Sequence, residues 1–354
     1  MISASHNPFE FNGIKVFNGE GYKLSDAVEA RIEEKILSKE PLPLCTHGDI
    51  GRRHHGMKRL REDYVEYVAK TIDCDLAGLR ILVDCANGAA SATAEELFDH
   101  FKAYVDIIYR DPDGVNINNG CGSTHMETLA KMVVAGGYDV GVAFDGDADR
   151  CLLVDETGEV IDGDHIMGIL ADFMKKNGKL KGGAVGTIIT NLGLHAFLEE
   201  HNIPILSTKV GDRYVLECMR AEGWNIGGEQ SGHLILSDFA TTGDGQLTAV
   251  QFLCAMKMMG KPASELNRMI ESFPQVSINV GAPNAVKHQV AQLPAVVQVG
   301  EEIKAAFNGA GRVVIRPSGT EPKVRVMVEG RDKTLVEELA KKAAEVVKNA
   351  VAAL

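Results

Sequence analysis

The chain has 354 residues, of which 49 are acidic and 37 basic, and its formal net charge is −12. This acidic balance argues against general nucleic-acid binding, because the phosphate backbone attracts basic surfaces. Hydrophobic residues make up 45% of the chain, yet no apolar run is long enough to cross a bilayer. The length predicts a soluble protein with two to four domains.

The seven cysteines are scattered along the chain, and none of them has C-x-x-C spacing. This pattern is typical of reduced, mostly buried thiols rather than of disulfides or a zinc site. The first residues lack the basic stretch and apolar segment of a secretory signal. We therefore expect a cytoplasmic protein.

Residues 1–24 have the composition of a loop with a short strand, since Asn-Pro and Asn-Gly favour turns. Ser25 is a plausible helix cap, and the apolar residues Val28, Ile32 and Ile36 recur at helical spacing. This spacing predicts an amphipathic helix.

Residues 39–56 are rich in Pro, Gly and His and indicate a domain boundary, with a helix expected over 57–72. From residue 79 onward, apolar strands alternate with helical segments. Such alternation predicts an α/β fold: consecutive α/β sandwich domains with mixed sheets flanked by helices. The tail differs, because a strand, a helix near 294–307, a hairpin and a long helix capped near Asp332 predict a C-terminal α+β domain.

The acidic loop DGDADR lies between two apolar runs. Its carboxylates, Asp145, Asp147 and Asp149, alternate along the chain and can converge on one hard cation. An EF-hand is disfavoured, because Arg150 stands where that loop needs glycine and strands flank the segment. A phosphatase with Asp145 as its nucleophile remains an alternative. A plain solvated turn is disfavoured, because three like charges so close repel one another.

The segment GGEQSGH has glycines that let a ligand approach the backbone. Glu229, Ser231 and His233 offer acceptors and donors suited to sugar hydroxyls. A simple turn explains this segment equally well.

The segment RPSGTEPKVRV combines two guanidinium groups, Arg316 and Arg325, with Ser318, Gly319 and Thr320. Forked donors, hydroxyls and backbone N–H groups together favour a phosphate dianion. A tight hairpin turn accounts for the Pro and Gly residues but not for the arginines.

The opening loop SASHNP carries Ser5, and Lys15 follows shortly after. The chain has no G-x-S-x-G elbow, which disfavours an acyl-transfer serine. A phosphoryl group on Ser5 would add oxygen ligands and negative charge beside the acidic loop. A capped turn at the chain end is the alternative interpretation.

The four loops SASHNP, DGDADR, GEQSGH and RPSGTEP, in this order, resemble those of the α-D-phosphohexomutase superfamily over essentially the whole chain. The resemblance is greatest to the bacterial branch that interconverts glucosamine 6-phosphate and glucosamine 1-phosphate for amino-sugar and cell-wall precursor synthesis. It implies that phosphorylated Ser5 gives its phosphoryl group to the sugar and regains one from a 1,6-bisphosphate intermediate. It also implies Mg²⁺, held by Asp145, Asp147, Asp149 and the phosphate on Ser5.

The resemblance further implies that Lys15 or His233 moves the hydroxyl proton. The substrate-binding residues that it implies are His6, Asn7, Arg150, Glu229, Ser231, Arg316, Ser318, Gly319, Thr320 and Arg325. The expected partner is a phosphosugar, with no nucleic acid and no membrane; the sequence does not indicate an oligomeric state.

The predicted domains are a remnant of domain 1 with the phosphoserine loop at 1–56, a metal-loop domain at 57–155, a sugar-loop domain at 156–272 and a phosphate-loop domain at 273–354. In the family the serine loop lies well inside the first domain. The resemblance therefore implies an N-terminally truncated mutase that is weakly active or inactive.

Two alternatives to this interpretation stay open. In the first, the chain is a phosphomannomutase or phosphoglucomutase. In the second, it is a non-catalytic phosphosugar-binding fragment that carries all four loops.

Overall fold

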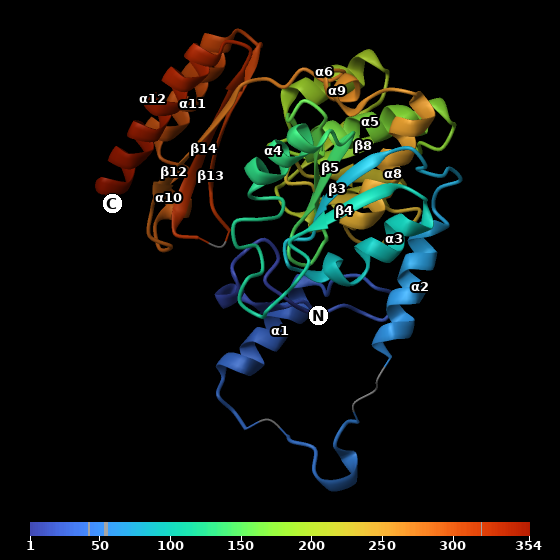
Figure 1. Ribbon diagram of the computed structural model, residues 1–354. Helices are drawn as coiled ribbons and strands as arrows, with labels where there is room; N and C mark the ends of the chain where they lie inside the picture. Colours follow the sequence, from blue (N-terminus) through green and yellow to red (C-terminus); the bar gives the residue numbers. More distant parts are fainter. Residues whose placement is uncertain (42, 53–55, 320) are drawn as a thin grey trace. The chain divides into compact units, whose positions relative to one another are not determined.

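The fold was analysed in a computed structural model, which describes residues 1–41, 43–52, 56–319 and 321–354. The chain forms two compact units, unit 1 (Met1–Gly163 with Ser231–Leu266) and unit 2 (Asp164–Gln230 with Asn267–Leu354). Figure 1 traces the chain through both. Strands and helices alternate through most of each unit, so the predicted α/β class is confirmed.

The elements of unit 1, in chain order, are β1 (Ile2–Ser3), η1 (Phe9–Phe11), β2 (Gly13–Ile14), α1 (Asp26–Leu37), η2 (His47–Asp49), α2 (Met57–Ala69), β3 (Arg80–Asp84), η3 (Ala89–Ala92), α3 (Ala94–His100), β4 (Tyr104–Ile108), α4 (Met126–Gly136), β5 (Val140–Phe144), β6 (Cys151–Asp155), β7 (Val160–Ile161), β11 (Leu234–Leu236), α8 (Gly245–Met259) and α9 (Ala263–Asn267), whose last residue belongs to unit 2.

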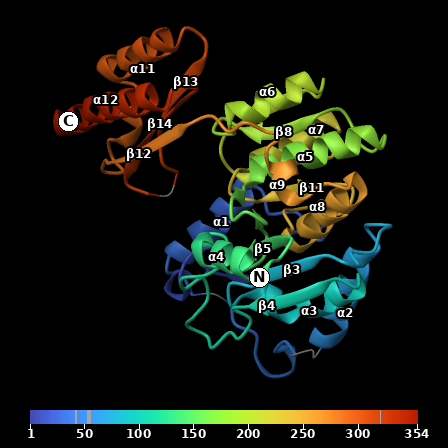
Figure 2. The same ribbon diagram turned by 45° about the horizontal axis from the view of Figure 1, so that its top comes forward.

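The main sheet of unit 1 has the strand order β4-β3-β5-β6-β7. Strands β4, β3 and β5 are parallel, whereas β6 and β7 join antiparallel, which makes the sheet mixed as predicted. The connections β3–α3–β4 and β4–α4–β5 cross the sheet in opposite directions. Because such crossovers are right-handed, α3 and α4 cover opposite faces, and Figure 2 shows the strands between them.

Two loops meet where the parallel strands end. The loop after β3 contains Ala86 and Asn87, both with positive φ. At Gly88, an added Cβ would lie 2.3 Å from the carbonyl oxygen of Gly146, in the loop after β5. A glycine is therefore required for this close approach. The carboxyl ends of parallel strands are the usual location of binding sites in open α/β sheets.

The elements of unit 2, in chain order, are α5 (Gly163–Lys176), whose first residue belongs to unit 1, then β8 (Ala184–Thr187), α6 (Leu192–Glu200), β9 (Ile205–Thr208), α7 (Asp212–Glu222), β10 (Ile226–Gly228), β12 (Gln275–Gly281), α10 (Lys287–Val290), α11 (Pro294–Phe307), β13 (Gly311–Pro317), β14 (Lys323–Gly330) and α12 (Lys333–Ala352). Strands β10 and β9 each pair in parallel with β8.

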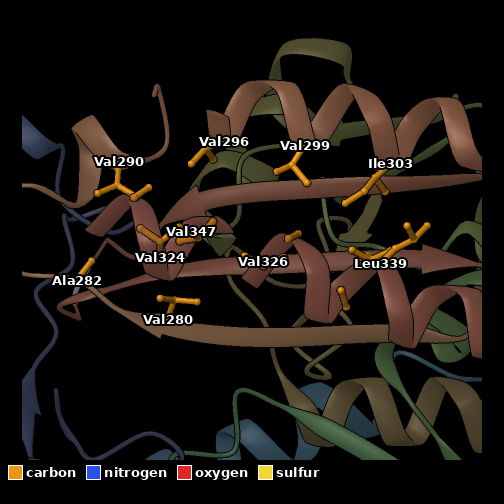
Figure 3. Packing of buried hydrophobic residues seen from close by; sticks show 14 of the residues in the cluster. Val280, Ala282, Val290, Val296, Val299, Ile303, Val324, Val326, Leu339 and Val347 are labelled. Atoms are coloured by element: carbon orange, nitrogen blue, oxygen red, sulfur yellow. The ribbon is translucent and has the colours of Figure 1, made fainter. Parts of the chain in front are cut away.

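The last part of unit 2 is the predicted α+β segment. Its antiparallel sheet has the order β12-β14-β13, and helices α11 and α12 pack on it. Figure 3 shows the buried side chains between them, among them Val299, Ile303 and Val326. The side chain of Asp332 accepts hydrogen bonds from the N–H groups of Thr334 and Leu335, so the predicted cap is confirmed.

Helix α1 forms where the apolar spacing predicts it, and Ser25 is its N-cap residue, but the serine side chain makes no capping hydrogen bond. Val28, Ile32 and Ile36 are 38%, 40% and 67% exposed, so their apolar stripe is not buried within the part of the chain that the structure describes. Among the described residues, no helix combines the length and apolarity needed to cross a bilayer.

Candidate active site around Ser5 and the acidic loop

The acidic loop follows β5 directly and gathers three carboxylates. One oxygen from each of Asp145, Asp147 and Asp149 lies within 4.8 Å of the others. Asp145 is fully buried, and burial together with the charges of Asp149 and Asp147 raises its pKa to about 7. Oδ1 of Asp147 is buried and has no hydrogen-bond partner among the described residues. Three such groups need positive charge, and together they could hold one cation.

Ser5 lies against this loop in a strained conformation. Its φ is 52°, in the left-handed region that a serine adopts at a cost of roughly 1–2 kcal/mol. Its Oγ lies 3.4 Å from Oδ2 of Asp145 and 3.4 Å from Nδ1 of His6. The N–H of Gly146 donates to the carbonyl of Ser5 over 3.1 Å. The acidic loop therefore holds the serine loop directly.

A second serine completes this contact. Ser3 Oγ accepts a hydrogen bond from the N–H of Ser5 over 2.8 Å and donates one to Oδ2 of Asp147. The predicted serine and metal loops are thus adjacent although about 140 residues separate them in the chain.

Lys15 supplies the nearest positive charge. Strands β1 and β2 pair antiparallel, and the N–H of Lys15 donates to the carbonyl of Met1, which places this lysine beside the serine loop. Its Nζ lies 2.5 Å from Oδ2 of Asp147 and 3.0 Å from Oδ2 of Asp149. Burial opposes the charge, but the hydrogen bond to Asp147 and the attraction of Asp149 outweigh it and raise the pKa of Lys15. Lys15 is therefore an ammonium here.

Arg150 and His233 also approach the cluster. Arg150 Nε is 3.9 Å from Oδ2 of Asp145 and 4.0 Å from Oδ1 of Asp149. His233 Nδ1 is 3.4 Å from Oδ1 of Asp149, while its Nε2 accepts from the N–H of Gly243 over 3.1 Å. With Nε2 engaged as an acceptor, Nδ1 carries the proton and faces Asp149. The role of His233 in proton transfer stays a prediction.

A cavity of about 290 Å³ opens beside Lys15 and is also lined by Asp147, Asp149, Tyr64 and Gln246. This is near the lower end of the size range of ligand pockets, roughly 300–1,000 Å³. Its charged wall includes Lys15 and two carboxylates of the acidic loop, Asp147 and Asp149. A small polar ligand in this cavity would therefore lie beside the acidic loop.

Sequence reasoning missed Asn118. This residue is 5% exposed, and its Nδ2 donates to the carbonyls of Ser5 and Asn7, each over 2.8 Å. Asn and Gly cluster in the segment NINNG, which indicates a loop with positive φ, and Asn118 has φ 58°. The sequence therefore predicts a loop at Asn118. It does not predict that the amide of Asn118 binds residues more than 110 positions away.

The sugar-binding candidates are placed as follows. Glu229 is half-buried, and its Oε1 accepts from the N–H of Gly211 over 3.0 Å. Ser231 is exposed. Gly232 has φ 91°, and an added Cβ would lie 2.4 Å from the carbonyl oxygen of Cys151, so only glycine fits there.

The phosphate-loop candidates gather around the β13–β14 hairpin of unit 2. The register places Arg316 directly opposite Arg325, an arrangement of like charges that is unfavourable in a sheet. Arg325 Nη2 pairs with Glu321 over 2.6 Å, but its Nε is buried without a hydrogen-bond partner among the described residues. Burial and the charge of Arg325 lower the pKa of Arg316. An anion between the two guanidinium groups would relieve both costs.

The remaining residues of this loop are less constrained. Ser318 is buried, and its Oγ accepts from the N–H of Glu321 over 3.2 Å. An added Cβ at Gly319 would meet nothing within 4 Å. Thr320 lies outside the described residues. Of the serine-loop candidates, His6 is half-buried beside Ser5, whereas Asn7 is exposed and contributes its carbonyl to Asn118.

Comparison with known families assigns the chain to a class. Models of the phosphoglucomutase/phosphomannomutase family match it in four successive segments: domain I at residues 1–42, domain II at 62–158, domain III at 162–273 and the C-terminal domain at 278–346. The chain belongs to this family of α-D-phosphohexomutases. The predicted domain boundaries stay predictions.

Within this family, the chain is similar to curated phosphoglucosamine mutases. The phosphoglucosamine mutase of Clostridium kluyveri is 47% identical over 98% of this chain and 78% of its own length. That of Acetivibrio thermocellus is 50% identical over 98% of this chain and 77% of its own length. Among solved structures, N-acetylphosphoglucosamine mutase of Aspergillus fumigatus, in complex with GlcNAc-6P and magnesium, has a TM-score of 0.78 at 19% identity, over 99% of this chain and 88% of that chain. This structural likeness shows the fold.

Exchanging Asn118 for Asp tests its hold on the serine loop. The carboxylate keeps the shape but replaces an N–H donor with an oxygen that faces two carbonyls. Because two hydrogen bonds of roughly 1 kcal/mol each are lost, we expect amide exchange of residues 3–9 to accelerate about tenfold or more. Hydrogen–deuterium exchange mass spectrometry measures this. Asn119→Asp, an exposed neighbour, adds the same charge and is the control. Equal exchange in both variants would contradict the assignment.

Proposed function

We propose that this chain is a phosphoglucosamine mutase, which interconverts glucosamine 6-phosphate and glucosamine 1-phosphate. The observation that carries the proposal is the position of Ser5 Oγ, 3.4 Å from Asp145, at the edge of the three-aspartate cluster. The curated relatives with this name match 98% of the chain, which supports the amino-sugar substrate. A phosphomannomutase or phosphoglucomutase remains the alternative within the family.

Ser5 is the proposed carrier of the phosphoryl group. In the forward step the bond from phosphorus to Ser5 Oγ breaks while a bond to the sugar 1-hydroxyl forms, and the hydroxyl proton passes to a base. The bisphosphate then returns its 6-phosphoryl group to Ser5. Phosphoryl transfer depends mainly on positioning and charge stabilisation. The strained backbone of Ser5, held by Gly146 and Asn118, supplies the positioning.

The cluster of Asp145, Asp147 and Asp149 fits Mg²⁺, a hard cation that prefers oxygen ligands. The buried Oδ1 of Asp147, which has no hydrogen-bond partner in the part of the chain that the structure describes, supports this assignment. When bound, the ion would add positive charge beside the phosphate of Ser5. The guanidinium of Arg150 lies about 4 Å from the carboxylates of Asp145 and Asp149 and would add a second positive charge to the site.

Lys15 is the proposed proton-transfer group or fixed cation beside the reacting hydroxyl. Its ion pairs with Asp147 and Asp149 raise its pKa and keep it protonated in this structure, so in this state it can stabilise negative charge, and it would have to lose its proton before it could accept one from the hydroxyl.

The arginine pair of the C-terminal hairpin is the proposed site for the phosphate that does not react. Arg316 and Arg325 face each other across β13 and β14 and offer forked donors, and Ser318 adds a hydroxyl. His6, Asn7, Glu229, Ser231, Gly319 and Thr320 complete the proposed substrate-binding set. Binding the distal phosphate would supply the energy that orients the reacting end.

Phosphorylation of Ser5 can be measured without turnover. Incubation with glucose 1,6-bisphosphate should add one phosphoryl group, about 80 Da by intact mass, because the serine is the carrier. Ser5→Ala should abolish this addition and any mutase activity, whereas Ser38→Ala, at an exposed serine, should change neither. A phosphoryl group that survives Ser5→Ala, with release of inorganic phosphate, would indicate the Asp145 phosphatase instead.

The same preparation identifies the substrate. In a coupled assay with glucosamine, glucose and mannose 6-phosphates side by side, we expect the highest kcat/KM for the amino sugar. Faster turnover of either hexose would support the alternative within the family. A chain that neither gains a phosphoryl group on Ser5 nor turns over any sugar would support the alternative of a non-catalytic binding fragment.

The arginine pair makes a separate prediction. Replacing Arg325 or Arg316 with Met removes charge-assisted hydrogen bonds worth roughly 1.5–3 kcal/mol to the anion. We expect the KM for the sugar phosphate, and the Kd for inorganic phosphate by calorimetry, to rise at least about tenfold. Arg331→Met, at an exposed arginine paired with Glu271, is the control. Unchanged binding in both pair variants would contradict the phosphate site.

A further inference from the structure

Two cysteines far from the active-site loops lie in contact. Cys74 Sγ is 2.7 Å from Cys254 Sγ, and the S–H of Cys74 points at the second sulfur. Cys254 belongs to the buried helix α8, whereas Cys74 lies in the irregular segment between α2 and β3 and is half-buried. Since a disulfide bond is about 2.05 Å long, the two sulfurs need to move only about 0.7 Å closer to bond.

The contact is held in place from both sides. The side chain of Gln251 donates to the carbonyl and hydroxyl oxygens of Thr71, over 3.1 Å and 2.9 Å. One helical turn beyond Cys254, Lys257 donates to the carbonyl of Ala77. The two residues of each of these three contacts are 180 positions apart in the chain. Successive contacts therefore follow one another along both the segment 71–77 and helix α8. The flanking hydrogen bonds therefore hold the sulfurs together.

The other five cysteines are less suited to oxidation; Cys218 is half-buried, and burial with the charge of Glu222 raises its pKa. Burial raises the pKa of Cys85 and Cys121 to about 12 each, which disfavours the reactive thiolate. Cys151 is fully buried, and burial raises its pKa as well. Cys45 is exposed, but the structure shows no second sulfur beside it among the contacts of the described residues.

We propose that Cys74 and Cys254 form a redox-active pair that closes to an intramolecular disulfide when the protein meets hydrogen peroxide. The more accessible Cys74 thiolate attacks one peroxide oxygen, which gives a sulfenic acid and hydroxide. The sulfur of Cys254 then displaces the sulfenic oxygen as water. In sum, two thiols and one peroxide give one disulfide and two waters, and the two electrons lost by sulfur reduce the peroxide.

The disulfide would fasten the segment after α2 to α8. The same two helices already meet at the other end of α8, where the hydroxyl of Tyr64 donates to both carboxylate oxygens of Asp244, the N-cap residue. The oxidised form would therefore add a covalent link near the C-terminal end of α8, whereas the Tyr64–Asp244 contact lies at its N-terminal end, where the N–H of Gly245 donates to the carbonyl of Ala148 in the acidic loop. Dithiothreitol would reverse the link.

The experiment treats the full chain with a small excess of hydrogen peroxide and digests it with trypsin without reduction. We expect a peptide of residues 71–80 joined to a peptide of residues 221–257, the two tryptic fragments that contain Cys74 and Cys254. The intact mass should fall by about 2 Da, and the thiols that titrate after denaturation should fall from seven to five. Both changes should disappear with dithiothreitol.

Two variants make the result specific. Cys45→Ser, at the exposed thiol, should leave the link intact, whereas Cys74→Ser should abolish it and retain six thiols after peroxide. Link formation does not depend on mutase activity, so its failure and that of the proposed function are distinguishable. Peroxide that only adds oxygen, at Cys45 or at the exposed Met258, with residues 71–80 unlinked, would overturn the proposal.

Discussion

The repulsion among Asp145, Asp147 and Asp149 is the constraint on which the site depends. Gathering three carboxylates, one buried and two half-buried, within 4.8 Å of one another is costly unless positive charge offsets them. In the structure Lys15 pairs with Asp147, and Arg150 lies 3.9 Å from Asp145, so two positive charges offset part of this repulsion. The oxygen of Asp147 that has no partner among the described residues marks the charge that is still lacking.

The serine loop is built around the same cluster. Ser3 and Gly146 tie Ser5 to the acidic loop, and Asn118 fixes the loop from a third segment. These contacts hold Ser5 at positive φ, where a serine alone would not stay. The backbone of Ser5 is therefore held in a strained conformation that places its hydroxyl next to the three aspartates. This placement fits the proposal that a cation and a phosphoryl group share the space.

The sequence predicted the parts of this arrangement that depend on local patterns. Alternating strands and helices predicted the α/β class, and Asp332 predicted the cap of the last helix, because propensity and capping act over a few residues. The four loops supplied the candidate site residues, whose roles stay predictions. Ser5, Lys15 and the aspartates are adjacent in the structure.

Contacts that depend on tertiary register could not be predicted in this way. Nothing near Asn118 in the sequence indicates that its amide binds the carbonyls of Ser5 and Asn7. Arg316 and Arg325 lie opposite each other because of the register between β13 and β14. The contact between Cys74 and Cys254 depends on how α8 packs against the segment after α2. Scattered cysteines indicated only reduced thiols, because spacing along the chain says nothing of sulfurs that meet across 180 residues.

The most direct test of the central claim is ³¹P NMR of the chain phosphorylated on Ser5, titrated with paramagnetic Mn²⁺. If the phosphate and the three aspartates share one cation, one equivalent of Mn²⁺ should broaden the phosphoserine resonance beyond detection. Asp147→Asn should restore a sharp line at the same concentration, whereas Asp111→Asn, at an exposed carboxylate, should not. A phosphoserine resonance that stays sharp in the unaltered chain would contradict the account.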